Sequence, residues 1–446
     1  MTGRYKAYPE YMTADSKWLD EIPAHWKVAA LKHVLSTPIT DGPHSTPIFQ
    51  DEGIPFVSAE AVSGGYINFD KIRGHISEED DALFSQKYRP QLHDVYMIKS
   101  GATTGISAIV ETNRRFNIWS PLAVMRCKKS YDPYFLLNYL RSDSFQKSVQ
   151  LSWTFGTQQN IGMNTLENLT VCFPPFEEQQ KIANFLNHET TKIDTLIAKQ
   201  EKLIELLKEK RQAVISHAVT KGLNPDAPMK DSGVEWLGDV PEHWDMKRLK
   251  YIGEAKNGLT YSPDDVVPEG EGVLVLRSSN IQDAKLSFTN NVYVNMDIPL
   301  RIRTQKDDLL ICSRNGSRQL IGKNALITEE AVDMAFGAFM VVFRSKLNPY
   351  LYWVLNSPLF EYQSGSFLTS TINQLTIGNL ESMEIPLPPS DEQELIRQYL
   401  IEKMDYFDQL ISKSACKVDL LKERKTALIS AAVTGKIDVR DWQESA

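Results

Sequence analysis

Cysteine is scarce in this chain and never closely spaced. Only four occur among 446 residues, at Cys127, Cys172, Cys312 and Cys416, and no C-x-x-C spacing joins any two of them. Disulfides persist in oxidising compartments, and zinc sites need closely spaced ligands. The pattern therefore predicts reduced, structural thiols in a cytoplasmic protein without a metal site.

Long apolar runs are also missing. No run reaches the roughly 18 apolar residues that a membrane-crossing helix needs, and residues 1–6 lack the apolar core of a secretory signal. We therefore expect neither a membrane span nor export. With 42% hydrophobic and 24% charged residues, the composition is that of an ordinary globular protein, long enough for roughly two to four domains.

An excess of positive charge is absent too, since the formal net charge is -8. Taken alone, this value argues mildly against a nucleic-acid partner, but phosphate contacts are local and depend on where the basic side chains lie. Residues 301–323 hold six basic and two acidic side chains, and residues 113–129 hold five basic and no acidic ones. The charge distribution therefore leaves a nucleic-acid partner open.

The chain does contain an internal repeat, in which the pattern of the first half returns in the second half. The segment 173–180, Phe-Pro-Pro-Phe-Glu-Glu-Gln-Gln, returns 214 positions later at 387–394 as Leu-Pro-Pro-Ser-Asp-Glu-Gln-Glu. Upstream, the pattern Trp-Leu-x3-Pro-x-His-Trp at 18–26 returns at 236–244. A repeat of such a long period means two similar bodies and two similar connectors. Two related copies in one chain suit a partner that presents two separated sites.

Each copy opens with short apolar runs that glycine, proline, serine and asparagine interrupt, a pattern typical of strands. The expected strands are 54–57, 95–98 and 122–125 in the first copy, and 273–276, 309–312 and 339–343 in the second. One helix is expected after each set, at 133–149 and at 349–362. We therefore predict two mixed α/β globules in which strands dominate.

Each copy closes with a long helix, expected at 177–220 and 391–434. A Pro-Pro pair stands just before each helix and acidic residues fill its first turn, which suits the helix dipole. Apolar residues follow a three-four spacing along both helices, as in a coiled coil. Because each apolar stripe needs cover, an antiparallel pair is the expected arrangement. The stripe of the first helix consists of Ile182, Leu186, Ile193, Leu196, Leu203, Leu207 and Val214.

At this point the residues resemble a known family. The segment 230–244 is similar to the one that opens a recognition domain in type I restriction-modification specificity subunits, and a degenerate version stands at 15–26. The pattern Pro-Pro-x2-Glu-Gln-x2-Ile, at Pro174 and again at Pro388, resembles the start of that family's spacer helices. The alternation of globule and helix covers the whole chain.

The resemblance implies a tandem repeat of mixed α+β class with a pseudo-twofold relation. Two strand-rich α/β target recognition domains would be separated by two long antiparallel coiled-coil helices, which set the gap between two DNA half-sites. The implied divisions are residues 1–172 for the first recognition domain, 173–222 for the central spacer helix, 223–386 for a linker and the second recognition domain, and 387–446 for the C-terminal spacer helix.

The resemblance also implies what the chain binds. Each recognition domain would read one half of a split target in double-stranded DNA, and two methyltransferase subunits would dock on the helices, with two motor-nuclease subunits joining where restriction accompanies modification. The chain itself would be non-catalytic, with no cofactor or metal of its own. S-adenosylmethionine, ATP and magnesium would be bound by the partner subunits.

Three polar loops recur at matching places in the two globules and are the expected DNA contacts. Arginine pairs with guanine edges, asparagine and glutamine pair with adenine, and small hydroxyls hold phosphates. Ordinary turn chemistry accounts for the same residue types, so that alternative stays open. The candidate residues are Lys99, Ser100, Thr103, Thr104, Gln158, Gln159 and Asn160 in the first copy, and Arg277, Ser278, Asn280, Arg314, Asn315, Ser317, Arg318, Thr371, Asn373 and Gln374 in the second.

Two other functions remain as alternatives. A duplicated helical protein of this kind is also compatible with an interaction scaffold whose globules bind protein rather than DNA. The sequence Pro263-Asp264, followed by Asp283-Ala284-Lys285, mimics the carboxylate pattern of a metal-dependent nuclease. The first copy has no equivalent of that pattern, so the nuclease is the weaker alternative.

Overall fold

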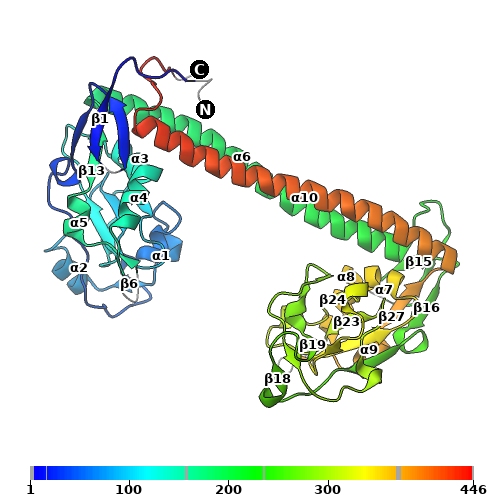
Figure 1. Ribbon diagram of the computed structural model, residues 1–446. Helices are drawn as coiled ribbons and strands as arrows, with labels where there is room; N and C mark the ends of the chain where they lie inside the picture. Colours follow the sequence, from blue (N-terminus) through cyan, green and yellow to red (C-terminus); the bar gives the residue numbers. More distant parts are fainter. Residues whose placement is uncertain (1–4, 17, 156–158, 235–236, 368–372, 444–446) are drawn as a thin grey trace. The chain divides into compact units, whose positions relative to one another are not determined.

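The computed structural model describes residues 5–16, 18–155, 159–234, 237–367 and 373–443. The chain divides into two compact units, unit 1 with Met1–Glu201 and Cys416–Ala446, and unit 2 with Lys202–Ala415. Each unit holds one strand-rich globule and one part of each of the two long helices (Figure 1).

A four-stranded antiparallel sheet forms the centre of each globule, with the same topology in both. In unit 1 its order is β4 (Thr40–Asp41), β10 (Leu122–Met125), β7 (Val95–Ile98) and β8 (Ser107–Ile109). In unit 2 its order is β17 (Glu254–Asn257), β26 (Met340–Arg344), β23 (Leu309–Cys312) and β24 (Asn324–Leu326). The strands expected from the sequence in this sheet are confirmed, with only β26 shifted by one residue.

A second, smaller sheet also repeats. In unit 1, β5 (Ile54–Val57) lies between β6 (His75–Ile76) and β9 (Asn117–Ile118). In unit 2, β19 (Val273–Leu276) lies between β22 (Tyr293–Val294) and β25 (Ala335–Phe336), with β18 (Val266–Val267) at the edge. The pairs β5–β9 and β19–β25 are both parallel and share one register, so Ser58 and Arg277, which follow β5 and β19, occupy matching places.

Two glycines fix how closely these sheets approach one another. Gly42 follows β4 and Gly258 follows β17. A Cβ atom on Gly42 would lie 2.0 Å from the carbonyl oxygen of Ile118, and one on Gly258 would lie 2.2 Å from that of Gly337. No side chain fits in such a space, so both globules require glycine at the same step of the chain.

Two short helices follow each central sheet, where the sequence predicted a single one. They are α3 (Pro133–Leu140) and α4 (Asp143–Leu151) in unit 1, and α7 (Asn348–Leu355) and α8 (Pro358–Ser366) in unit 2. The single-helix prediction was wrong because a serine stands at the N-cap of a new helix in each copy. Ser142 caps α4 by accepting the Phe145 N–H at 3.3 Å, and Ser357 precedes Pro358, which disfavours helical backbone there.

Antiparallel strand pairs carry the chain into and out of each globule. In unit 1 they are β1 (Tyr11–Ser16) with β2 (Leu19–Pro23), and β3 (Lys27–Ala30) with β13 (Thr170–Phe173). In unit 2 they are β14 (Met229–Asp231) with β15 (Asp239–Pro241), and β16 (Asp245–Arg248) with β27 (Glu384–Leu387). Strands β13 and β27 each lead directly into a long helix.

The long helices are α6 (Phe176–Lys221) and α10 (Ser390–Val433), each within one residue of its predicted limits. In unit 1 the start of α6, at Ile182, shares a core with the end of α10, at Leu428. In unit 2 the end of α6, at Ile215, shares a core with the start of α10, at Ile396. The helices therefore pack in opposite directions (Figure 1). Among the described helices, none combines the length and apolar character needed to cross a bilayer.

The predicted apolar stripe is only partly buried. Ile182, Leu186 and Ile193 are buried, whereas Leu196 and Leu203 are 42% and 41% exposed. Their expected place in the helix seam was therefore wrong, because the middle of α6 buries less of its surface than its ends. The ends are covered by the globules as well as by the neighbouring helix.

A carboxylate at the start of each long helix binds the repeated Pro-x-His-Trp segment. Glu178 accepts hydrogen bonds from the indole of Trp26 at 3.0 Å and the hydroxyl of Tyr8 at 2.6 Å, and it contacts His25 Nε2 at 2.8 Å. Glu392 accepts from the indole of Trp244 at 3.0 Å. These contacts anchor each helix to its globule.

The cysteines lie as reduced thiols in different settings. All four are free, with Cys172 and Cys312 buried and Cys416 exposed on α10. Burial raises the pKa of Cys127 and of Cys172 to about 12. Those two thiols therefore stay protonated at neutral pH and act as small apolar groups.

Candidate nucleic-acid interface

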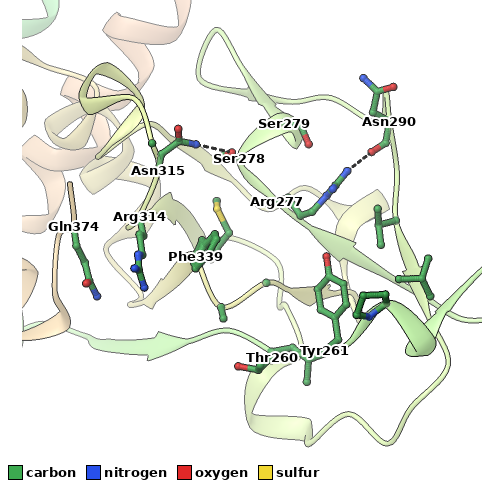
Figure 2. A pocket seen from close by; sticks show the side chains of 18 of the residues that line it. Thr260, Tyr261, Arg277, Ser278, Ser279, Asn290, Arg314, Asn315, Phe339 and Gln374 are labelled. Carbon is green, nitrogen blue, oxygen red and sulfur yellow. Dashed lines mark hydrogen bonds between the residues drawn. The ribbon is translucent and has the colours of Figure 1, made fainter. Parts of the chain in front are cut away.

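The predicted loops of the second copy line one open hollow in unit 2. Its volume is about 1250 Å³. Six predicted residues line it: Arg277, Ser278, Arg314, Asn315, Asn373 and Gln374. They come from three separate places in the chain, namely the residues after β19, the residues after β23 and the segment before α9 (Ile377–Ser382). The fold thus brings the three loops of this copy to one surface (Figure 2).

The charge of this hollow differs from that of the whole chain. Its lining residues include two arginines and no aspartate or glutamate, although the chain carries a net charge of -8. Serine, threonine, asparagine and glutamine side chains supply most of its other polar groups. A surface of this chemistry suits a polyanion with hydrogen-bonding edges.

Arg277 forms one wall of the hollow. One of its terminal nitrogens donates to the carbonyl oxygen of Asn290 at 2.7 Å (Figure 2). Its backbone N–H donates to Asn280 Oδ1 at 3.0 Å, which fixes the turn after β19. The half-buried side chain is thus held in one direction and keeps further N–H donors for a ligand.

Arg314 lies opposite, against an aromatic ring. Its guanidinium carbon is 5.3 Å from the ring centre of Phe339, a cation–π contact. Its backbone N–H donates to the carbonyl oxygen of Phe339 at 3.1 Å, and a bridge pairs it with Gln374. Figure 2 shows the Arg314 side chain between Gln374 and Phe339.

Asn315 and Ser278 join the two walls. Asn315 Nδ2 donates to the hydroxyl of Ser278 at 3.2 Å (Figure 2). Asn315 Oδ1 also accepts the backbone N–H of Ser317 at 3.0 Å. Both side chains therefore hold the loops together and face the hollow at the same time.

Other predicted residues of this copy have different places. Asn280 is fully buried, and its amide donates to Ser287 O at 2.9 Å and to Asn291 at 3.1 Å. Its prediction as a DNA contact was wrong, because every polar atom of the side chain forms hydrogen bonds within the turn and none is exposed. Ser317 and Arg318 are exposed outside the hollow, and Arg318 donates to Gly365 O at 3.1 Å. The predicted residue Thr371 lies outside the described residues.

The loops of the first copy follow the same backbone pattern. Ser100 pairs with Asn160 as Arg314 pairs with Gln374. The N–H of Ile161 donates to Lys99 O at 2.9 Å, and that of Leu375 donates to Ser313 O at 2.7 Å. The expected equivalence of the loops therefore holds at the level of hydrogen bonds.

Several polar side chains of unit 1 remain accessible at this place. Gln159 and Asn160 are exposed on β12 (Gln159–Asn160), and Thr103 is half-buried. Thr104 donates to Gly101 O at 2.7 Å, so its hydroxyl shapes the turn. The predicted residue Gln158 lies outside the described residues.

Lys99 is committed to an ion pair within unit 1. Its ammonium lies 3.3 Å from Asp41 Oδ2, and only 13% of its side chain is exposed. Asp41 is completely buried and also contacts Lys87 and His44. The positive charge of this predicted DNA contact is thus partly neutralised by a buried carboxylate.

The sequence analysis missed the aromatic residues of the hollow. Tyr261 and Phe339 both line it, as does Thr260. Phe339 was counted as part of a strand, yet 58% of it is exposed. The available signal was Gly337, two residues before it in the chain, because glycine is typical of turns.

Comparison with known proteins identifies the family. Residues 23–206 and 241–415 each match the family model described as Type I restriction modification DNA specificity domain. The chain belongs to this family. It carries two DNA specificity domains in tandem, and both halves of the chain therefore serve DNA target recognition.

Two relatives named as specificity subunits are similar to this chain over most of their length. A Methanocaldococcus jannaschii protein, provisionally designated the specificity subunit of type I restriction enzyme MjaX, is 27% identical over 445 residues and is aligned across 95% of this chain and 96% of its own length. The EcoKI specificity subunit of Escherichia coli is 21% identical, with 88% of this chain and 84% of that protein covered.

Solved structures show the same fold. A chain from a study of complex assembly and conformational transition of the type I R-M system superposes with a TM-score of 0.71 at 18% identity, covering 93% of this chain and 99% of that one. The HsdS subunit from Thermoanaerobacter tengcongensis gives a TM-score of 0.52 at 18% identity, covering 93% and 98%. The predicted tandem arrangement of mixed globules and long helices is thereby confirmed.

Proposed function

We propose that this chain is the non-catalytic specificity subunit of a type I restriction-modification complex and reads a split target in double-stranded DNA. The globule of unit 1 reads one half-site and the globule of unit 2 reads the other. The chain directs adenine methylation, or cleavage, that partner subunits perform. S-adenosylmethionine, ATP and magnesium belong to those partners.

The duplication carries this proposal. Two specificity domains stand in one chain, and each presents equivalent loops beside equivalent strand ends. A single recognition surface would need only one such domain. Two of them in one chain suit a target with two separated parts, which is how symmetric or pseudo-symmetric readers contact DNA.

The chemistry of the unit 2 hollow supports DNA as the ligand. Two arginines without a neighbouring carboxylate in the lining attract phosphates and can pair with base edges. We assign the first contacts in unit 2 to Arg277, Arg314, Asn373 and Gln374, and those in unit 1 to Ser100, Thr103, Gln159 and Asn160. Lys99 has a smaller role because Asp41 already pairs with it.

The long helices offer a surface for protein partners. Leu206 on α6 and Leu420 on α10 stand at equivalent places in the repeat and are 48% and 58% exposed. Exposed leucines at repeated places suit two copies of one partner. We assign this surface to two methyltransferase subunits, with two motor-nuclease subunits joining a restriction-competent complex.

Methylation mapping tests the proposal directly. A host expressing this chain with its methyltransferase subunit is expected to carry adenine methylation at one split sequence, because the chain alone supplies specificity. The control host expresses the methyltransferase subunit without this chain and should lack that modification. Methylation at a continuous motif, or none that depends on this chain, would contradict the proposal.

Two simpler assays separate the alternatives. An interaction scaffold would give no change in fluorescence anisotropy of labelled duplex DNA, with or without methyltransferase subunits. A nuclease would cut plasmid when the pure chain is incubated with magnesium.

The motif that suggested a nuclease begins in a turn. Residues 262–265 form a capped turn, in which Asp265 accepts the Ser262 N–H at 2.7 Å. That bond lowers the pKa of the Asp265 carboxyl.

A further inference from the structure

The two recognition globules share a backbone but differ in side chains at the proposed DNA face. Strand pairing shows that Ser58 of unit 1 is equivalent in position to Arg277 of unit 2. Ser58 follows β5 and Arg277 follows β19, and each of these strands pairs with a parallel neighbour in the same register. The bridges Ser100–Asn160 and Arg314–Gln374 match Ser100 to Arg314. Both arginines of the unit 2 hollow thus correspond to serines in unit 1.

Phe339, the aromatic residue that supports Arg314, has no aromatic counterpart at the matching position of unit 1. The N–H of Lys99 donates to Pro121 O at 2.8 Å, and that of Ser313 donates to Phe339 O at 3.0 Å. These equivalent bonds match Pro121 to Phe339. At these two matching positions unit 1 therefore has neither the guanidinium nor the ring, although Arg73 lies over the ring of Trp119, two residues before Pro121.

Both arginines of the hollow are held in place for directional bonding. Arg277 is fixed through Asn290 O, and its Nε is buried without a hydrogen-bond partner. Arg314 rests on Phe339 and is exposed. A guanidinium that is already oriented loses little entropy on binding and offers its planar fork to an acceptor pair. Guanine presents such a pair in the major groove, at O6 and N7.

We propose that unit 2 reads guanine through Arg277 and Arg314, whereas unit 1 reads its half-site without an arginine-bound guanine at the matching places. This inference rests on the proposed function, in which each globule reads one half-site. The target is then chemically asymmetric: the guanines on which recognition depends lie at the contacted positions of the unit 2 half-site. Ser100, at the place of Arg314, can contact any base or a phosphate and does not select guanine. Ser58, at the place of Arg277, is buried and offers no contact to DNA.

Selection from a randomised duplex library tests the inference, using the full chain in complex with its methyltransferase subunits. The wild-type complex should select a split motif. Arg314→Gln and Arg277→Gln should each remove the preference for guanine at one position of one half-site and leave the other half-site unchanged. Affinity for the wild-type target should fall about 10- to 100-fold for each substitution, as for the loss of a bidentate base contact. Arg248→Gln, which removes an exposed pair with Glu384 outside the hollow, is the matched control and should leave the motif intact.

A modified base separates reading of guanine from holding of phosphate. Replacing the selected guanine by 7-deazaguanine removes the N7 acceptor, so it should weaken the wild-type complex but have little further effect on the variant that lost this preference. A uniform loss of affinity in the variants, with every base preference retained, would assign both arginines to phosphates and overturn the inference. A split motif whose guanines do not depend on either arginine would overturn it too, while leaving the proposed function intact. If the wild-type complex selects no motif, both fail.

Discussion

At the scale of single residues, a buried ion pair recurs in both globules. Asp94 and Asp308 are 1% and 2% exposed, and each stands just before the central strand β7 or β23. Arg126 bonds both oxygens of Asp94, at 2.6 and 2.7 Å, and Arg344 bonds those of Asp308, at 2.8 and 2.6 Å. The bonds to these carboxylates raise the pKa of both arginines. The repeat therefore conserves an internal electrostatic contact as well as its surface loops.

Replacing Arg344 by methionine should destabilise unit 2. The change leaves the Asp308 carboxylate buried without its partner, which typically costs about 3–5 kcal/mol. Arg126→Met should have a comparable effect on unit 1. Thermal and denaturant melts measure both effects. Arg248→Met breaks the exposed pair with Glu384 and should change stability by less than about 1 kcal/mol. Equal small effects for all three variants would contradict this account.

Sequence reasoning found some of these residue-scale features and missed others. The loops with Arg277 and Arg314 were predicted from their residue types. The burial of Asn280 and the pairing of Lys99 with Asp41 were not. Asp41 is 58 residues from Lys99 in the sequence, and whether a lysine meets a carboxylate or solvent depends on how the strands pair. Local residue type carries no information on that.

At the scale of elements, the two long helices were predicted almost to the residue. The Pro-Pro pairs and the acids of the first turn mark the start, and Gly222 marks the end of the first helix. The sequence pattern did not show that one of the two acidic residues of the first turn, Glu178, also binds the globule. Glu178 is buried and binds Tyr8, Trp26 and His25, whereas its neighbour Glu177 is exposed. Dipole stabilisation applies to both, but anchoring falls to Glu178 alone.

Glu178→Ala should loosen the start of α6. The substitution leaves the Trp26 indole and the Tyr8 hydroxyl buried without an acceptor, at about 1–3 kcal/mol for each unsatisfied group. Hydrogen exchange should rise in β3 and the first turns of α6, and the melting temperature should fall. Glu177→Ala is the matched control and should change little. Equal behaviour of the two variants would remove the anchoring role.

At the scale of the whole molecule, net charge and function point in opposite directions. The chain carries -8, yet the proposed DNA face of unit 2 is lined by two arginines and no carboxylate. Only the sign of the charge at the contact decides attraction to phosphates, because the Debye length is about 8 Å at physiological salt. Carboxylates farther away than this are largely screened.

DNA affinity of the complex should therefore fall steeply with salt. For several phosphate contacts, an increase from 50 to 200 mM monovalent salt should weaken binding by roughly 10²–10³-fold, since each neutralised phosphate releases counterions. Anisotropy titrations of a labelled duplex measure the slope. Arg318→Gln, at an exposed arginine outside the hollow, should reduce the slope without altering base preference. A salt-independent affinity would contradict electrostatic binding by these surfaces.

The sequence by itself determined the duplication, six strands of the two globules, the long helices and the family, because repeated residues and apolar periodicity are local properties of the chain. Tertiary structure alone decided which polar residues share a surface. Residues after β19, after β23 and before α9 meet at one hollow through strand pairing over long separations, and Phe339 joins them because a turn leaves its ring exposed. Such contacts depend on the register of distant strands, which packing of the whole globule selects.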